Sequence, residues 1–283
     1  MSRYGRASVS TFGPLVSGAW LRERLADPDL RVIDFRWYQD GRSGRDAYLA
    51  GHVPGAVFVD LEGEVTGPRP GLGRHPLPER EAFERAMRAA GVRRDSRVVV
   101  YDDQAGLSAG RLWWMLRYFG HPEVAVLDGG LGAWPGDLAS GEVHVEPGDF
   151  VAGEPRPGWR VDFEDVPRLP DATVLLDARS AERYRGEPHP LDARRGHIPG
   201  ARSAPWDANL GPDGRFKPPD ELRRRFQELG VQRGEDVVAY CGSGVSACHD
   251  LIALELAGLP GARLYPGSWS DWTAREGTPA ETG

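Results

Sequence analysis

The sequence contains little cysteine, no basic tract and no long apolar run, and each absence excludes a class of protein. Two cysteines among 283 residues are too few for a disulfide framework, and no Cys-x-x-Cys pair suggests a zinc site. The formal net charge of −7 argues against a nucleic-acid partner. No apolar run approaches the length that spans a membrane, and residues 1–14 lack the apolar core of a signal peptide. We therefore expect a cytoplasmic protein that binds no nucleic acid, membrane or metal.

Four landmarks occur twice along the chain, in the same order and about 140 residues apart. They are an apolar run that ends in aspartate, a Gly-His-x-Pro-Gly-Ala segment, an apolar run that ends in tyrosine, and a segment with glycine and tryptophan. In this order they lie at 32–34, 51–56, 97–101 and 129–134, and again at 174–177, 196–201, 236–240 and 267–272. The chain is therefore predicted to contain two copies of one domain, and each copy is long enough for a hydrophobic core of its own.

Both copies alternate short β-branched runs with segments of helical pattern, which is typical of an α/β domain whose parallel sheet is covered by helices. We expect strands at 31–35, 97–101 and 124–127, and at 173–177, 236–240 and 262–265. The expected helices cover 17–25, 109–119 and 248–257, and a further helix begins near Pro78. Residues 138–160 are rich in Gly, Pro and Glu and are predicted to link domains at 14–137 and 161–283.

The most specific chemical signal is the run Cys-Gly-Ser-Gly-Val-Ser-Ala at 241–247, between an expected strand and an expected helix. Backbone N–H groups converge at a helix N-terminus and the helix dipole favours negative charge, so both lower the pKa of a thiol there. Glycines let the loop curl so that its amides face Cys241 or an anion attached to it. The candidate substrate-binding residues of this loop are Gly242, Gly244, Val245 and Ser246. The alternative for Cys241 is a buried structural thiol, which is also our interpretation of Cys248.

The paired Gly-His-x-Pro-Gly-Ala segments, the loop at Cys241 and the Gly-Ser-Trp-Ser-Asp-Trp segment resemble tandem-domain rhodaneses over roughly residues 14–275. The loop looks most like that of 3-mercaptopyruvate sulfurtransferases. The resemblance implies two rhodanese-like domains and an enzyme in which Cys241 takes sulfur from a small donor as a persulfide and passes it to a thiol or cyanide. It implies no cofactor, and a thioredoxin-like reductant is a candidate partner. The first domain is expected to be catalytically inactive, because Asp102 stands where the second has Cys241.

The donor stays open between 3-mercaptopyruvate and thiosulfate. Thiosulfate-preferring relatives typically carry cations directly after the cysteine; Gly242 and Ser243 stand there instead, which favours a carboxylate donor. Arg183 matches an arginine that the family uses to bind the donor carboxylate through paired N–H groups, and otherwise it would lie on a solvated helix face. Mercaptopyruvate enzymes typically carry a second arginine six positions before the Gly-His pair, where this chain has Pro190. Nearby substitutes are Arg194 and Arg195.

A proton relay is the second catalytic feature that the resemblance implies. His75 matches a first-domain histidine assigned in relatives to a relay with the loop serine, here Ser243, and an acid, for which Glu62 stands at the matching position. A histidine near its ordinary pKa can move a proton during the transfer. The alternative for His75 is a surface side chain in a Pro-rich loop. We interpret His52 and His197 as structural, since they occur in both copies, including the inactive one.

Other functions compete with a 3-mercaptopyruvate enzyme. A cysteine phosphatase also holds a thiolate in an amide-lined loop, but its loop typically carries an arginine six residues after the cysteine, where this chain has Ala247. Thiosulfate:cyanide sulfur transfer as the main activity uses the same nucleophile. A persulfide carrier that serves a partner protein would use the same loop as well. The presence of Cys241, Arg183 and Ser243 together favours an enzyme over a carrier.

Overall fold

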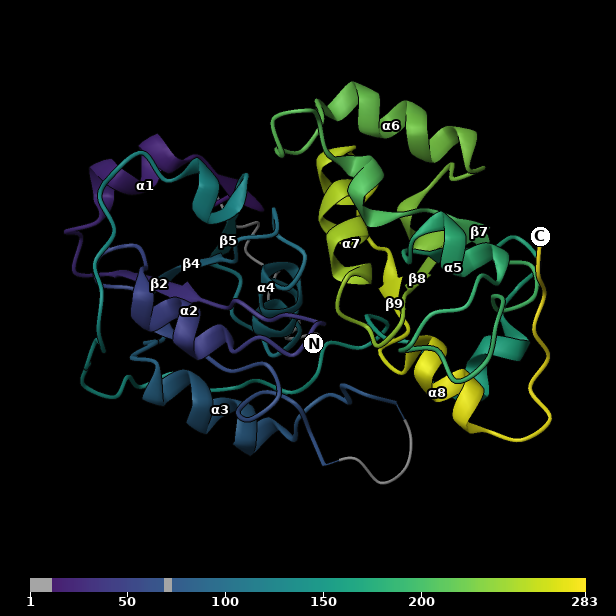
Figure 1. Cartoon of the computed structure of the whole chain (residues 1–283), viewed down its shortest axis with the longest axis horizontal. Coiled ribbons are helices and arrows are strands. Elements are labelled where there is room, and N and C mark those ends of the chain that lie inside the picture. The colour runs from purple at the N-terminus through teal and green to yellow at the C-terminus, as the bar shows by residue number, and fades with distance from the viewer. Residues whose placement is uncertain (1–11, 69–72) are drawn as a thin grey trace, which may run out of the picture.

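Figure 1 shows the computed structural model, which describes residues 12–68 and 73–283, as two α/β domains side by side. Residues 1–11 lie outside the described part of the chain, and they include most of the segment 1–14 that was assessed for a signal peptide. Each domain contains one parallel sheet with helices around it, so the predicted fold class is confirmed. No helix in the described ranges is long and apolar enough to cross a bilayer.

The first sheet has five parallel strands in the order β1-β5-β4-β2-β3. Its strands are β1 (Leu15–Val16), β2 (Leu30–Asp34), β3 (Val57–Phe58), β4 (Arg97–Tyr101) and β5 (Val124–Leu127). The helices of this domain are α1 (Gly18–Arg24), α2 (Gly44–Ala50), α3 (Arg80–Ala89), α4 (Ala109–Tyr118) and a 3-10 helix at Gly130–Ala133. Asp34 lies opposite Tyr101, so the two central strands end together at the carboxyl edge of the sheet.

The second sheet repeats this plan with four parallel strands in the order β7-β6-β8-β9. Its strands are β6 (Val174–Asp177), β7 (Arg202–Ser203), β8 (Val237–Tyr240) and β9 (Arg263–Leu264). The helices are α5 (Ala181–Arg185), α6 (Pro219–Glu228), α7 (Ala247–Leu256) and α8 (Ser268–Ala274), with 3-10 helices at Phe163–Arg168, Trp206–Asn209 and Gly234–Asp236. A parallel bridge between Arg160 and Leu264 stands where the first sheet has β1. The duplication seen in the sequence is therefore a duplication of topology.

Local signals account for most element boundaries. Ser17 caps α1 as expected, since its Oγ accepts the Trp20 N–H at 3.2 Å. Helix α3 begins at Arg80, two residues later than the expected start at Pro78, because Glu79 keeps an extended backbone with ψ 146°. The two-residue strand β1 was not predicted, because a run this short has no measurable periodicity.

Helices α4 and α7 pack against each other where the domains meet (Figure 1). Apolar side chains from both helices, among them Leu112 and Ile252, belong to one buried cluster that continues into both sheets. The expectation of a separate core in each copy is wrong on this side, because α4 buries nine of its ten residues and so presents apolar side chains to both domains. Separate clusters remain on the other face of each sheet. The continuous core holds the two carboxyl edges in a defined relation.

The segment at 138–160 joins the domains without a helix or a named strand. Phe150 is buried in the shared core, and its N–H donates to the Val92 carbonyl at 3.1 Å. At the other end, the Leu264 N–H donates to the Trp159 carbonyl at 3.0 Å. These contacts attach the segment to both domains along its length.

Candidate active site

Cys241 lies directly after β8 and before α7, at the carboxyl edge of the second sheet. Its side chain is 2% exposed, and the thiol is free. Helix α8 holds the main chain in place: the Trp269 N–H donates to the Cys241 carbonyl at 2.9 Å, and the Cys241 N–H donates to Oγ of Ser268 at 3.1 Å. Ligands bind at this edge of parallel sheets because strand ends and helix N-termini meet there.

Residues 241–246, the thiol loop, curl around the sulfur. The Gly244 N–H donates to Sγ of Cys241 at 3.1 Å. Gly244 has φ +76°, and a Cβ at that position would lie 2.5 Å from the Pro266 carbonyl oxygen, so the turn requires glycine. Among the described residues, the N–H groups of Ser243, Val245 and Ser246 have no hydrogen-bond acceptor. These donors remain available to an anion bound at the sulfur.

The second thiol, Cys248, is a core residue, in line with our interpretation of the sequence. Its Sγ donates to the Gly244 carbonyl at 3.4 Å, and burial raises the pKa of the Cys248 thiol to about 12. The group is therefore protonated at neutral pH. A buried, protonated thiol is a poor nucleophile, so Cys248 is unsuited to the role predicted for Cys241.

The structure brings together the three residues predicted for a relay. Nδ1 of His75 lies 2.8 Å from Oγ of Ser243, and Nε2 of His75 lies 3.3 Å from Oε1 of Glu62. Burial lowers the pKa of His75 to about 4, so the ring is neutral at physiological pH. We assign the proton to Nε2, facing the carboxylate, because Nδ1 then accepts from the serine hydroxyl. His75 is a buried interdomain residue and not a surface histidine.

Arg111 of α4 ties this relay to the thiol loop across the domain boundary. Its Nη1 donates to the Gly244 carbonyl and its Nη2 donates to the His75 carbonyl, each at 3.0 Å. The side chain is 1% exposed, and this burial lowers the pKa of Arg111. The sequence analysis missed Arg111, because an arginine in an otherwise apolar helix gives no sign of which domain it contacts.

Arg183 on α5 is buried at 9% exposure, so it does not lie on a solvated helix face. Its Nε and Nη2 donate to the two carboxylate oxygens of Asp192 at 2.8 and 2.6 Å. Burial alone would raise the pKa of Asp192, but the hydrogen bonds and charge of Arg183 lower it overall. The bidentate pair fixes the guanidinium and leaves its Nη1 without an acceptor among the described residues.

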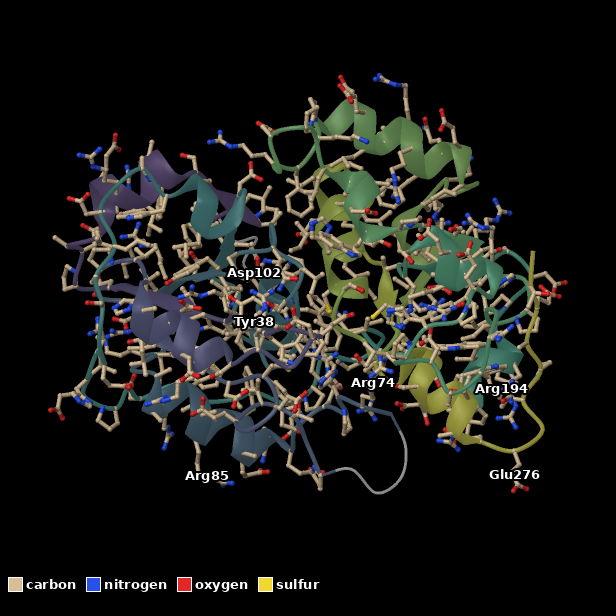
Figure 2. All side chains as sticks on the ribbon, viewed as in Figure 1. Tyr38, Arg74, Arg85, Asp102, Arg194 and Glu276 are labelled. Atoms are coloured by element: carbon tan, nitrogen blue, oxygen red, sulfur yellow. The ribbon has the colours of Figure 1, made fainter. Side chains whose placement is uncertain are left out.

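Relatives carry a second arginine where this chain has Pro190, and the sequence suggested two nearby arginines as substitutes. Neither of them lies beside Arg183. Arg194 donates to Oγ1 and to the carbonyl of Thr278 at 3.0 and 2.6 Å, which attaches it to the C-terminal segment. Arg195 is exposed. Figure 2 shows Arg194 well out in the second domain, away from the junction with the first.

Arg74, from the first domain, lies beside Arg183 instead. A Cβ built on Gly242 would be 2.7 Å from Nη2 of Arg74 and 3.0 Å from Nη2 of Arg183, so both guanidinium groups face the residue next to Cys241. Figure 2 shows Arg74 where the two domains meet. The sequence analysis missed this residue, although its position directly before His75 placed it next to an expected interdomain contact.

A pocket of about 320 Å³ opens between the domains beside the thiol loop. The second domain lines it with Arg183, His189 and Ser246, and the first domain with residues that include Tyr38 and Gln104. Burial and then the charge of Arg183 lower the pKa of His189, so this ring is neutral at physiological pH. A pocket of this volume accommodates a small organic acid with accompanying water.

The other residues considered in the sequence lie outside this centre. Nδ1 of His52 lies 2.9 Å from the Tyr48 carbonyl, and Nδ1 of His197 lies 2.8 Å from the Tyr184 carbonyl, contacts that fit a structural role. Asp177 is paired with Arg179 at 2.6 Å beneath the loop. The described residues contain no group of three or more His, Cys, Asp or Glu side chains that could hold a metal ion.

Comparison with known proteins places the chain among sulfurtransferases. The model of the rhodanese-like domain matches residues 17–137 and 164–275. A Pseudomonas aeruginosa protein named probable 3-mercaptopyruvate sulfurtransferase is 46% identical over 279 residues, which cover 95% of this chain and 98% of that protein. The 3-mercaptopyruvate sulfurtransferase of Escherichia coli K12 is 40% identical over 94% of this chain and 97% of its own. A Mycobacterium tuberculosis protein, provisionally named thiosulfate sulfurtransferase SseB, is 40% identical over 92% of this chain and 93% of its own.

Solved structures show the same architecture. The crystal structure of SseA from Escherichia coli, described as a 3-mercaptopyruvate sulfotransferase with the rhodanese fold, has a TM-score of 0.81 and 39% identity. The match covers 91% of this chain and 99% of SseA. Tum1 from Saccharomyces cerevisiae, 26% identical, also has a TM-score of 0.81, over 96% of this chain and 99% of Tum1. With two matched domains and relatives that align over nearly its whole length, the chain belongs to the rhodanese-like family as a tandem-domain member.

Proposed function

We propose that this protein is a sulfurtransferase that moves one sulfur atom from 3-mercaptopyruvate, through a persulfide on Cys241, to a thiol or cyanide acceptor. The observation that carries the proposal is the hydrogen-bonded chain Ser243–His75–Glu62 beside the thiol loop. Relatives at 40% and 46% identity that are named as 3-mercaptopyruvate sulfurtransferases support the choice of donor.

In the donor half-reaction, the Cys241 thiolate attacks the sulfur of the donor. An S–S bond forms and the donor's C–S bond breaks, and the electron pair of that bond leaves on carbon as the enolate of pyruvate. The donor's thiol proton comes off the new persulfide and a proton joins the enolate carbon, so the step consumes no net proton. Ser243 and His75 carry this proton, since a neutral ring 2.8 Å from Oγ can accept and return it.

The persulfide is held as an anion by the loop itself. Sγ of Cys241 already accepts from Gly244, and the free N–H groups of Ser243, Val245 and Ser246 are placed in the same short loop. Backbone donors in a water-poor site stabilise negative charge without having to reorganise. The outer sulfur therefore stays reactive until an acceptor enters the interdomain pocket.

In the acceptor half-reaction, the acceptor attacks the outer sulfur. The S–S bond breaks, Cys241 leaves as a thiolate, and the acceptor departs as its own persulfide, or as thiocyanate if it is cyanide. A thioredoxin-like dithiol would take the sulfur, form its own disulfide and release hydrogen sulfide, which balances the two electrons. This partner and a cytoplasmic location remain predictions from the sequence.

Thiosulfate is the second candidate donor. Thiolate attack on its outer sulfur displaces sulfite, a leaving group that needs no proton on carbon. The paired charges of Arg74 and Arg183 at Gly242 favour this dianion more than the neutral loop residues suggest. A persulfide carrier would use the same loop but turn over small donors slowly.

The test is the intact mass of the protein after brief exposure to each donor, with Cys241→Ser in parallel. We expect the mass of one added sulfur atom from 3-mercaptopyruvate in the wild type and none in the variant. Uptake chiefly from thiosulfate would replace the donor but keep the chemistry. A folded wild-type protein that takes sulfur from neither donor would contradict the enzyme and support the carrier.

A further inference from the structure

Arg74 is a partly buried cation that forms no ion pair with a carboxylate of the described residues. Its side chain donates to the Leu191 carbonyl, and its main-chain N–H donates to Oγ of Ser270 at 3.1 Å. Among the described residues, no Asp or Glu oxygen lies within ion-pair distance of its guanidinium. Burial and then the charge of Arg183 lower the pKa of Arg74, and the opposite effects of Cys241 and Asp192 do not cancel this shift.

The two arginines beside Gly242 are unequal in this respect. Arg183 is neutralised by the bidentate contact with Asp192, whereas Arg74 meets only a carbonyl oxygen. Two guanidinium groups that converge on one small residue repel each other, and an anion between them removes the repulsion. Only glycine allows both groups to approach the loop this closely, since a Cβ at Gly242 would lie 2.7 Å from Nη2 of Arg74 and 3.0 Å from Nη2 of Arg183.

We infer that Arg74 of the first domain is the second donor-binding cation, and that it forms with Arg183 a clamp for the anionic end of the sulfur donor. Nη2 of Arg74 and Nη1 of Arg183 remain available for hydrogen bonds to the donor's carboxylate. These nitrogens face Gly242, which directly follows Cys241 in the chain, so a bound carboxylate places the donor's sulfur near the nucleophile. This inference rests on the proposed function, because it names the recognition element of the same site.

The clamp explains how this chain can bind the donor without the second arginine, whose position is held by Pro190. A second-domain arginine is unnecessary there if the first domain supplies the charge. It also makes the donor site interdomain, with one cation from each copy, so the catalytically inactive first domain takes part in substrate recognition. The continuous core at α4 and α7 fixes the position of the two cations relative to each other.

The first experiment measures single-turnover persulfide formation against the concentration of 3-mercaptopyruvate for wild type and Arg74→Met. We expect the half-saturating concentration to rise about 10- to 100-fold in Arg74→Met, because a charge-assisted hydrogen bond to the bound donor is lost. The limiting rate should stay within about threefold of the wild-type rate. Arg74→Lys should recover part of the affinity. Arg195→Met removes the charge of an exposed arginine outside the thiol loop; it is the matched control and should behave as wild type. A half-saturating concentration unchanged in Arg74→Met would overturn the inference.

A second experiment does not depend on sulfur transfer. Iodoacetate and iodoacetamide alkylate thiols by the same reaction, but only iodoacetate carries a carboxylate. The ratio of the iodoacetate rate to the iodoacetamide rate at Cys241 therefore measures how strongly the site attracts a carboxylate. We expect Arg74→Met to lower this ratio about tenfold, with Cys241→Ser identifying the modified residue. An unchanged ratio contradicts the clamp. If the wild type takes up no sulfur but the ratio still falls in the variant, the proposed function fails while the anion site stands.

Discussion

The thiol loop of the second domain has a counterpart at residues 102–108 of the first, the aspartate loop, and the two start from the same framework. Tyr101 and Tyr240 end the central strands opposite Asp34 and Asp177, respectively. In each copy the tyrosine hydroxyl accepts the main-chain N–H of the Gly-His-x-Pro-Gly segment at 3.1 Å. The frameworks match, so the difference in function arises in the loops themselves.

The aspartate loop is filled by its own carboxylate. Asp102 accepts main-chain N–H groups at 2.8 to 2.9 Å from four residues that follow it: Gln104, Gly106, Ser108 and Ala109. The thiol of Cys241 accepts one such bond, from Gly244. A carboxylate satisfies the amides and excludes any other anion, whereas a thiol leaves them for the sulfur that it will carry. The first residue of each loop thus determines whether the loop amides are already satisfied.

Each loop also contacts a histidine of the other domain. Nδ1 of His75 reaches Ser243 in the thiol loop, while Nε2 of His249 lies 3.2 Å from the Ala105 carbonyl in the aspartate loop. His249 stacks on Phe216 with ring centroids 4.2 Å apart and is fully buried. His75 instead connects to Glu62, whose side chain is half exposed. The corresponding interdomain contact is part of the packing on one side, and on the other it is the proposed path for the proton.

The largest effect should come from the nucleophile. Cys241→Ser should lower sulfur transfer at least about 10⁴-fold, because a hydroxyl at this position forms no persulfide. Steady-state assays with both donors measure the loss. Cys248→Ser is the control, and it should keep sulfur uptake since its thiol is buried and protonated. Equal loss in both variants would show that the second thiol also carries sulfur.

Removal of the relay should have the next largest effect. Ser243→Ala and His75→Gln should each lower the rate of persulfide formation from 3-mercaptopyruvate about 10²- to 10³-fold, because the enolate loses its proton source. Uptake from thiosulfate should fall less, since sulfite leaves without a proton. Asp103→Asn in the aspartate loop should leave both rates unchanged. A similar loss with both donors would mean that these residues only shape the loop.

Acid should destabilise the fold through both interdomain histidines. Burial lowers the pKa of His75 to about 4 and of His249 to about 3, whereas each titrates near 6.5 when unfolded. The unfolded chain therefore binds more protons in this range, and stability falls as the pH drops from about 6.5 toward 4. Asp250 acts in the opposite direction, because burial raises its pKa to about 7 and its contribution to stability is lost as the pH rises toward that value.

His75→Gln isolates the contribution of one histidine. Between pH 7.5 and 4.5 the wild type should lose on the order of 2 kcal/mol more unfolding free energy than the variant. Urea unfolding at the two pH values measures the difference. Equal losses would mean that His75 has the same pKa in the folded protein as in the unfolded chain, so that burial does not lower it.

A change in the aspartate loop should affect stability and leave sulfur transfer intact. Asp102→Asn replaces a charged acceptor of several N–H groups by a neutral one, and should lower the unfolding free energy by about 1–3 kcal/mol. Thermal unfolding at pH 7.5 measures the loss. Sulfur uptake per folded molecule should stay at the wild-type level. A large loss of uptake in a folded variant would show that the two loops are coupled.

Much of the fold could be predicted from the sequence because its signals are local. The strands at 97–101 and 124–127 were placed at the observed residues, since β-branched runs bounded by polar residues identify them. The duplication followed from four landmarks in the same order. The shared core was not predicted, because a helix that is mostly apolar does not indicate how many domains it contacts.

The sequence alone determined the family and the position of the thiol loop, and it predicted the nucleophile, because these depend on residues that are contiguous or regularly repeated. Only the tertiary structure decided which charges stand beside the thiol. Arg74 and Arg111 reach the thiol loop across the domain boundary, and His75 meets Ser243 over 168 positions of sequence. Such contacts depend on how α4 packs on α7, and no local pattern encodes that packing.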